Sequence, residues 1–156
     1  MTQTSVALSP DAQSQIVEAL NQSVAETAVA TMLAQNFHWN VTGMAFGPLH
    51  DLFQKIYEDH FVAQDDLAER IKALDGHAEG MLSAMVARSK VKEHDGHAPA
   101  EEMIQSMMVA QETLAATLKG CGDIAAEHGD TLTEDLCIAR GQEHEKFAWF
   151  LRSHLR

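Results

Sequence analysis

The chain has 156 residues, of which 46% are hydrophobic, and it carries a formal net charge of −12. The length is typical of one domain with a sizeable core, and the hydrophobic content excludes an intrinsically disordered chain. No run approaches the roughly 20 consecutive apolar residues that a membrane helix needs. The N-terminus shows neither the basic nor the apolar region of a signal peptide, so we expect a cytoplasmic protein with one domain over residues 1–156.

The distribution of charge argues against tight binding to DNA. The first basic residue is Lys55, and the end of the chain offers only Arg152 and Arg156. Proteins that grip duplex DNA use clusters of lysine and arginine to displace counterions from the phosphates. An acidic chain without such a cluster in its first 54 residues should be repelled by DNA instead.

The first predicted helix follows a short tail, residues 1–8. Ser9 is a good N-cap, and Pro10 suits the first helical position, where its missing N–H costs nothing. Apolar residues then recur at every fourth position, as expected for one buried face of a helix. They are Ile16, Leu20, Val24, Ala28 and Met32, and the helix runs to about Trp39.

A second helix is predicted over about residues 48–76, followed by a linker over 77–98 with a short helix at 81–88. A linker of this length suggests a crossover between the ends of a bundle. The third helix is predicted from Pro99 to Gly129. The fourth, capped by Thr131 or Thr133, continues to the C-terminus. The sequence therefore predicts an all-α four-helix bundle with a short extra helix in the second-to-third connection.

Four side chains of the metal-ligand type lie in the first half of the chain, namely His38, His50, Asp65 and Glu69. Asp65 and Glu69 are one turn apart and project from one face of the second helix. His50 lies on the same helix, roughly 22 Å before Asp65, so one metal ion cannot join both. If a second copy of this helix runs antiparallel beside the first, His50 of one chain faces both carboxylates of the other. Nitrogen and carboxylate ligands of this kind suit a catalytic iron.

Three short segments resemble the signature of the Dps-type mini-ferritins: residues 36–43 (NFHWNVTG), 46–52 around His50, and 65–70 (DDLAER). Residues 146–151 also resemble that family, and with the helix layout the resemblance covers nearly the whole chain. It implies a ferritin-like four-helix bundle and a hollow shell of twelve subunits. It also implies oxidation of Fe(II), mostly by hydrogen peroxide, and storage of the ferric mineral. The ferroxidase site of the family lies at the twofold interface. An intrachain di-iron site would need Glu-x-x-His motifs, and the chain has none.

Taken singly, each candidate ligand also has an ordinary structural interpretation. Carboxylates spaced like Asp65 and Glu69 are common on solvated helices. A histidine between aromatic residues, such as His38, is more often a hydrogen-bonded core residue, and His50 near a helix start could be a surface residue. Their joint spacing within the family signature favours the metal site over these alternatives.

Gln54 departs from the family pattern. It stands one turn after His50, where the family usually has a carboxylate, and an amide brings no negative charge to a metal ion. We expect two iron ions per intersubunit site, the first at His38, Asp65 and Glu69. The second, near His50 and Gln54, should be weaker. Trp39 adjoins His38, and its expected role is packing at the interface. The family suggests that it also quenches stray oxidising equivalents.

The start of the last helix carries three acidic residues, Asp130, Glu134 and Asp135. In the family, acidic residues in this region line threefold pores, where a ring of carboxylates would attract iron. Asp135 is the best single candidate. The alternative is that these side chains only complement the helix dipole.

The sequence thus predicts a ferroxidase, an iron-storing mini-ferritin that uses hydrogen peroxide or oxygen and protects against oxidative stress. One alternative is a nucleoid-associated protein that shields DNA, which the missing basic tail disfavours. Another is a structural shell with a degenerate metal site, which Gln54 keeps open.

Overall fold

The computed structural model describes residues 7–156, and every regular element in this part of the chain is a helix. The helices are α1 (Pro10–Asn40), α2 (Phe46–Ala73), α3 (Leu82–Arg88), α4 (Ala100–Glu127) and α5 (Thr131–Ser153). The predicted all-α fold is therefore confirmed, with its short helix at the predicted place. Of the predicted N-terminal tail, residues 1–6 lie outside the described residues.

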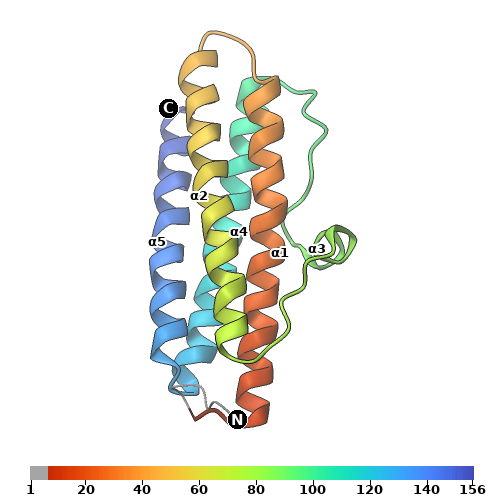
Figure 1. Cartoon of the computed structure of the whole chain (residues 1–156). Helices are drawn as coiled ribbons and strands as arrows, with labels where there is room; N and C mark the ends of the chain where they lie inside the picture. Colours follow the sequence, from red (N-terminus) through yellow and green to blue (C-terminus); the bar gives the residue numbers. More distant parts are fainter. Residues whose placement is uncertain (1–6) are drawn as a thin grey trace.

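The four long helices form two antiparallel hairpins, α1 with α2 and α4 with α5 (Figure 1). In Figure 1 α2 and α4 both run downwards, so the segment between them returns along the whole bundle. This is the predicted crossover. The C-terminal end of α1 and the start of α2 therefore meet at one end of the bundle, and the turn between α4 and α5 lies at the other end.

The helix ends follow from local chemistry. The backbone N–H of Ala12 donates to the Ser9 hydroxyl at 3.1 Å, which is the predicted cap of α1. After the end of α2 the left-handed residue is Asp75, with φ of 61°. A glycine usually adopts this conformation, but here Gly76 only follows it. Gly76 is required for a different reason, since a Cβ there would lie 2.6 Å from a methyl carbon of Val17. α2 and α1 approach each other closely at this point.

The predicted cap of the fourth helix is wrong by one to three residues. Asp130, and not Thr131 or Thr133, caps α5, because its carboxylate accepts the backbone N–H of Thr133 at 3.1 Å. Asp130 is itself fully buried. A carboxylate is a good N-cap, but burial of its charge requires a cationic partner.

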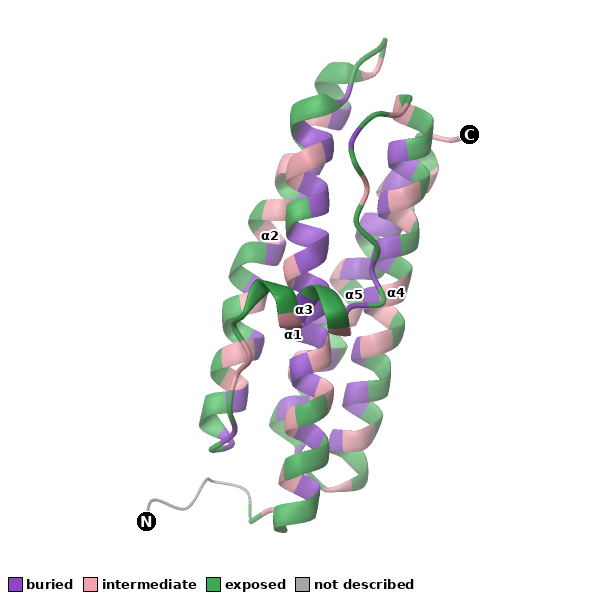
Figure 2. Ribbon diagram, turned by 90° about the vertical axis from the view of Figure 1, so that its right-hand side faces the viewer, coloured by how far each residue is buried: buried purple, intermediate pink, exposed green. Residues whose placement is uncertain are grey.

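The crossover is held against α1 by side-chain amides. Asn21 donates to the carbonyl of His77 at 2.9 Å, Gln22 to that of Arg88 at 2.9 Å, and Asn36 to that of His94 at 2.7 Å. α3 lies across the outside of α1, and most of its surface is exposed (Figure 2). Within the described residues no helix is both long and apolar enough to span a bilayer.

The core consists of two apolar clusters with a polar layer between them. One cluster gathers around Phe37, Phe53 and Met107, and the other around Ile16, Leu20 and Leu67. The polar layer contains fully buried side chains from α1, α2, α4 and α5: Glu26, Thr27, His60, Gln111 and His144.

Candidate metal centre

The short connection between α1 and α2 brings His38 and His50 together. His38 lies in the last turn of α1 and His50 in the first turns of α2. Their imidazole rings stack with centroids 3.7 Å apart and an interplanar angle of 16°. Two ligand-type side chains that are twelve residues apart thus form one compact pair at the end of the bundle.

Reciprocal hydrogen bonds fix the direction of both rings. Nδ1 of His38 lies 2.7 Å from the carbonyl oxygen of His50, and Nδ1 of His50 lies 2.7 Å from the carbonyl oxygen of His38. A carbonyl oxygen only accepts, so each Nδ1 carries the proton. In the neutral ring each Nε2 is then left with its lone pair. Metal-binding histidines are typically oriented in this way, through a backbone carbonyl on the second nitrogen.

Aromatic side chains surround the histidine pair. Phe46 stacks on His50 at 5.1 Å between centroids, and Tyr57 packs edge-on against His38 at 5.3 Å. Trp39 points outward with 61% of its surface exposed. A tryptophan so exposed on one chain is consistent with packing against another, and that packing stays a prediction.

Asp65 and Glu69 are exposed and lie on α2 with His50, as predicted. Since α2 is one unbroken helix, the roughly 22 Å between His50 and Asp65 is real within a chain. Over residues 7–156, no three histidine, cysteine, aspartate or glutamate side chains converge on one point. A single chain therefore carries the two parts of the predicted ligand set at separate places.

Gln54 is half-buried and donates its amide N–H to Glu58 at 2.8 Å. Because a carboxylate only accepts, this bond fixes which amide atom faces Glu58 and leaves the Gln54 oxygen free. The sequence did not predict this partner, although the two residues are one helical turn apart.

The three residues of the predicted pore have different environments. Asp130 is buried and accepts a hydrogen bond from the Arg70 guanidinium at 2.9 Å. Its carboxylate is thus used for the cap and for this ion pair, and it does not face solvent. Glu134 is half-buried and Asp135 is exposed. Only these two present a carboxylate at the surface.

Sequence reasoning missed a second group of polar residues, in the bundle core, made of Asp59, His60, Gln111, Arg140 and His144. One pattern could have found it. His60 lies four residues after Ile56 and seven before Leu67, so it occupies a buried position of α2. A histidine in the apolar register of a helix requires buried polar partners.

Comparison with known proteins gives one consistent result. Residues 17–156 match the ferritin-like domain family. General stress protein 20U of Bacillus subtilis is 36% identical over 141 residues, covering 90% of this chain and 97% of that protein. DNA protection during starvation protein 2 of Bacillus anthracis is 34% identical over 141 residues, covering 90% of this chain and 97% of that protein. The crystal structure of a Dps protein from Vibrio cholerae O1, described as a ferritin-like diiron-carboxylate protein, superposes with a TM-score of 0.92. It is 27% identical and covers 100% of this chain and 99% of that one.

Proposed function

Because the chain belongs to the ferritin-like domain family and is a Dps-type mini-ferritin, we propose that it oxidises Fe(II) with hydrogen peroxide and stores the ferric product. Membership supports iron storage and DNA protection in general terms. The oxidant, the site and the assembly are our proposal. Its assembly would be a shell of twelve subunits, in the cytoplasm, with sites at the twofold interfaces.

The observation that carries this proposal is the pair of oriented imidazoles. His38 and His50 present two Nε2 lone pairs at one place, on rings whose other nitrogens are already bonded. Exposed Asp65 lies farther along the same helix. An antiparallel partner helix would bring the partner's carboxylates to this pair, and each dimer would hold two identical sites.

The reaction balances with two iron ions. Two Fe(II) ions supply the two electrons that reduce one hydrogen peroxide, with two protons, to two water molecules. His38, Asp65 and Glu69 would hold the first iron, and His50 with Gln54 the second, more weakly. Trp39, next to His38, would donate an electron to a stray oxidising species before it escapes.

Mixing two inactive variants tests whether the site is shared between chains. His38→Ala and Asp65→Ala should each abolish rapid oxidation. When the two variants are mixed and reassembled at random, about a quarter of the sites should again have both intact halves. Peroxide-driven oxidation is followed at two Fe(II) per peroxide, with soluble iron co-eluting with the shell. No recovery on mixing would contradict a shared site, and unimpaired oxidation by either single variant would mean that the changed residue is not part of the ferroxidase site.

A second candidate function is direct shielding of DNA, because relatives such as the Bacillus anthracis protein are named for DNA protection. The charge of −12 and the absence of basic residues before Lys55 argue that this chain would protect DNA by removing iron and peroxide instead. Salt-sensitive retardation of duplex DNA by the assembled protein would favour direct shielding. We expect none.

A further inference from the structure

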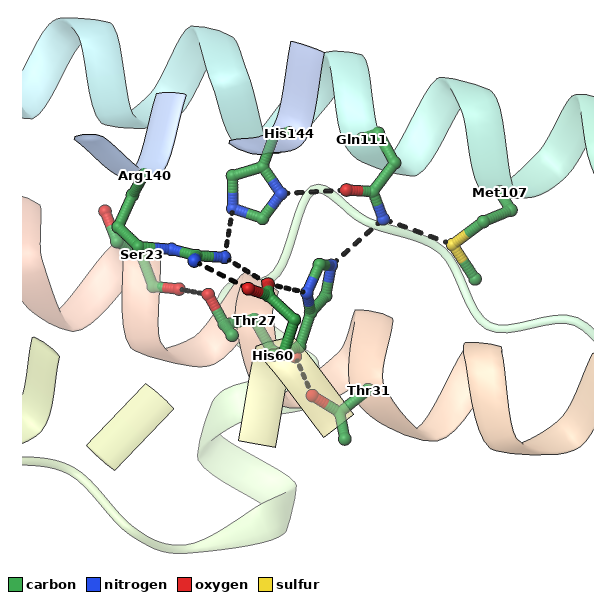
Figure 3. A network of polar contacts seen from close by, with 9 residues as sticks. Ser23, Thr27, Thr31, His60, Met107, Gln111, Arg140 and His144 are labelled. Carbon is green, nitrogen blue, oxygen red and sulfur yellow. Dashed lines mark hydrogen bonds and ion pairs between the residues drawn. The ribbon is translucent and has the colours of Figure 1, made fainter. Parts of the chain in front are cut away.

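A closed ring of hydrogen bonds lies in the middle of the bundle (Figure 3). His60 Nδ1 donates to Asp59 at 2.9 Å, and Gln111 Nε2 donates to His60 Nε2 at 3.0 Å. His144 Nδ1 donates to Gln111 Oε1 at 2.8 Å. Arg140 closes the ring, since its Nη2 lies 3.5 Å from His144 Nε2 and 2.7 Å from Asp59 Oδ2.

The two charged residues of the ring fix the position of each imidazole proton. Asp59 only accepts hydrogen bonds and Arg140 only donates them. His60 and His144 must therefore both carry their proton on Nδ1 and turn an Nε2 lone pair inward. Burial lowers the pKa of both imidazoles, that of His144 to about 2, so both are neutral at pH 7.

The Nη2 atom of Arg140 marks the point on which two metal-type ligands converge, the Asp59 carboxylate and the His144 Nε2 lone pair. Each of these ligands has a further partner behind it. His60 bonds the carboxylate and Gln111 bonds the imidazole, as second partners of metal ligands usually do. The centre of a helix bundle is also where ferritin-like proteins build intrachain metal sites.

The ring does not satisfy every hydrogen-bond donor of the Arg140 guanidinium. Among the described residues, Arg140 Nε is buried without a hydrogen-bond partner. A buried donor left unpaired is uncommon and calls for a reason other than its own bonding. The positive charge beside Asp59 is such a reason.

We propose that Arg140 is a resident cation that closes the bundle core to divalent metal ions, because its guanidinium occupies the point between Asp59 and His144 where an ion would bind. Exclusion of metal ions from the core has a biological role only if the proposed function holds, because iron would then bind at the subunit interface alone. The binding property itself does not. Solvent can reach the ring, as the side chains of Asp59 and Arg140 are 25% and 11% exposed.

Replacing the cation tests the proposal directly. In the full-length protein, Arg140→Ala should bind one more Co(II) per chain than the native protein, with a new ligand-field absorption band. Co(II) should also raise its melting temperature more than it raises that of the native protein. The double variant Arg140→Ala/His144→Ala should lose the additional ion. If Arg140→Ala fails to fold alone, recovery of its helical circular dichroism by Co(II), but not by Mg(II), is the same positive result.

Arg70→Ala is the matched control. Arg70 also pairs with a buried carboxylate, Asp130, but its other partner is the hydroxyl of Thr133 and no imidazole is involved. It should gain no Co(II). The proposal is overturned if folded Arg140→Ala binds no additional Co(II), if Co(II) does not refold an unfolded variant, or if Arg70→Ala gains the same ion. Because Co(II) is counted relative to the native protein, failure here is distinguishable from loss of ferroxidase activity in His38→Ala.

Discussion

Gln54 decides the charge of the proposed second iron position. Gln54→Glu keeps the shape of the side chain and adds the negative charge that the family usually has there. We expect the second Fe(II) to bind about tenfold more tightly in an anaerobic titration, an effect of roughly 1.4 kcal/mol. The same change replaces the bond to Glu58 with a like-charge pair one turn apart, which costs the metal-free helix about 0.2–0.5 kcal/mol. Gln54→Ala is the control and should weaken the second site. Equal affinities in all three proteins would mean that Gln54 is not a ligand.

Asp130 and Asp135 should behave in opposite ways when changed. Asp130→Ala removes a helix cap and leaves the Arg70 guanidinium without its buried partner, so we expect a loss of about 3–5 kcal/mol of unfolding free energy in urea. Asp135→Asn changes an exposed residue and should leave stability within about 0.5 kcal/mol. If Asp135 lines a pore, only this second variant should slow iron uptake into the assembled shell. Slowed uptake in folded Asp130→Ala, with normal uptake in Asp135→Asn, would reverse the assignment.

Among the elements, the crossover approaches α1 closely at a glycine whose backbone is left-handed. Gly96 has φ of +82°, and a Cβ there would lie 2.3 Å from the Asn36 side-chain oxygen. Gly96→Ala should therefore cost about 1–3 kcal/mol and expose the linker to proteolysis. Gly120→Ala is the control, because Gly120 lies inside α4 with open space around it and should be stabilised by about 0.5–1 kcal/mol. If both variants lowered stability equally, close packing at Gly96 would not be the cause.

The helices themselves could be predicted from the sequence, because Ser9, Pro10 and the apolar residues at every fourth position act locally. The cap of α5 also follows local preference, because aspartate ranks above threonine at an N-cap, but the burial of Asp130 against Arg70 depends on tertiary packing. Likewise, the spacing of His38 and His50 indicated ligands, but their stacking depends on how the turn between α1 and α2 closes. The polar ring in the core was missed because its five residues come from three helices.

For the whole molecule, the buried histidines set how stability responds to acid. His60 and His144 lie against each other, and Asp59 and Arg140 are the charged groups beside them. Burial lowers the pKa of each imidazole below its ordinary value of 6.5. The unfolded chain therefore takes up protons below pH 6.5 that the folded chain does not, so stability is full above that pH and falls as pH decreases. Each histidine contributes about 1.4 kcal/mol per pH unit to the slope of the unfolding free energy against pH. Below pH 4 the Asp59 carboxylate adds to the loss, because its pKa is also held below 3.8 by its bonds to His60 and Arg140, against the opposing effect of burial.

Urea unfolding of the native protein at pH 7.5, 6.5, 5.5 and 4.5, followed by circular dichroism, measures this slope. We expect little change between pH 7.5 and 6.5, and then a fall that approaches about 2.7 kcal/mol per pH unit as both histidines are protonated in the unfolded chain. His144→Gln removes one of the two titrating groups and should halve the slope, whatever its own effect on stability at pH 7.5. An unchanged slope in His144→Gln would show that the acid response comes from other groups. A rise in stability on acidification would mean that the two imidazoles gain protons in the folded core, which the directions of the ring's hydrogen bonds exclude unless one of them breaks.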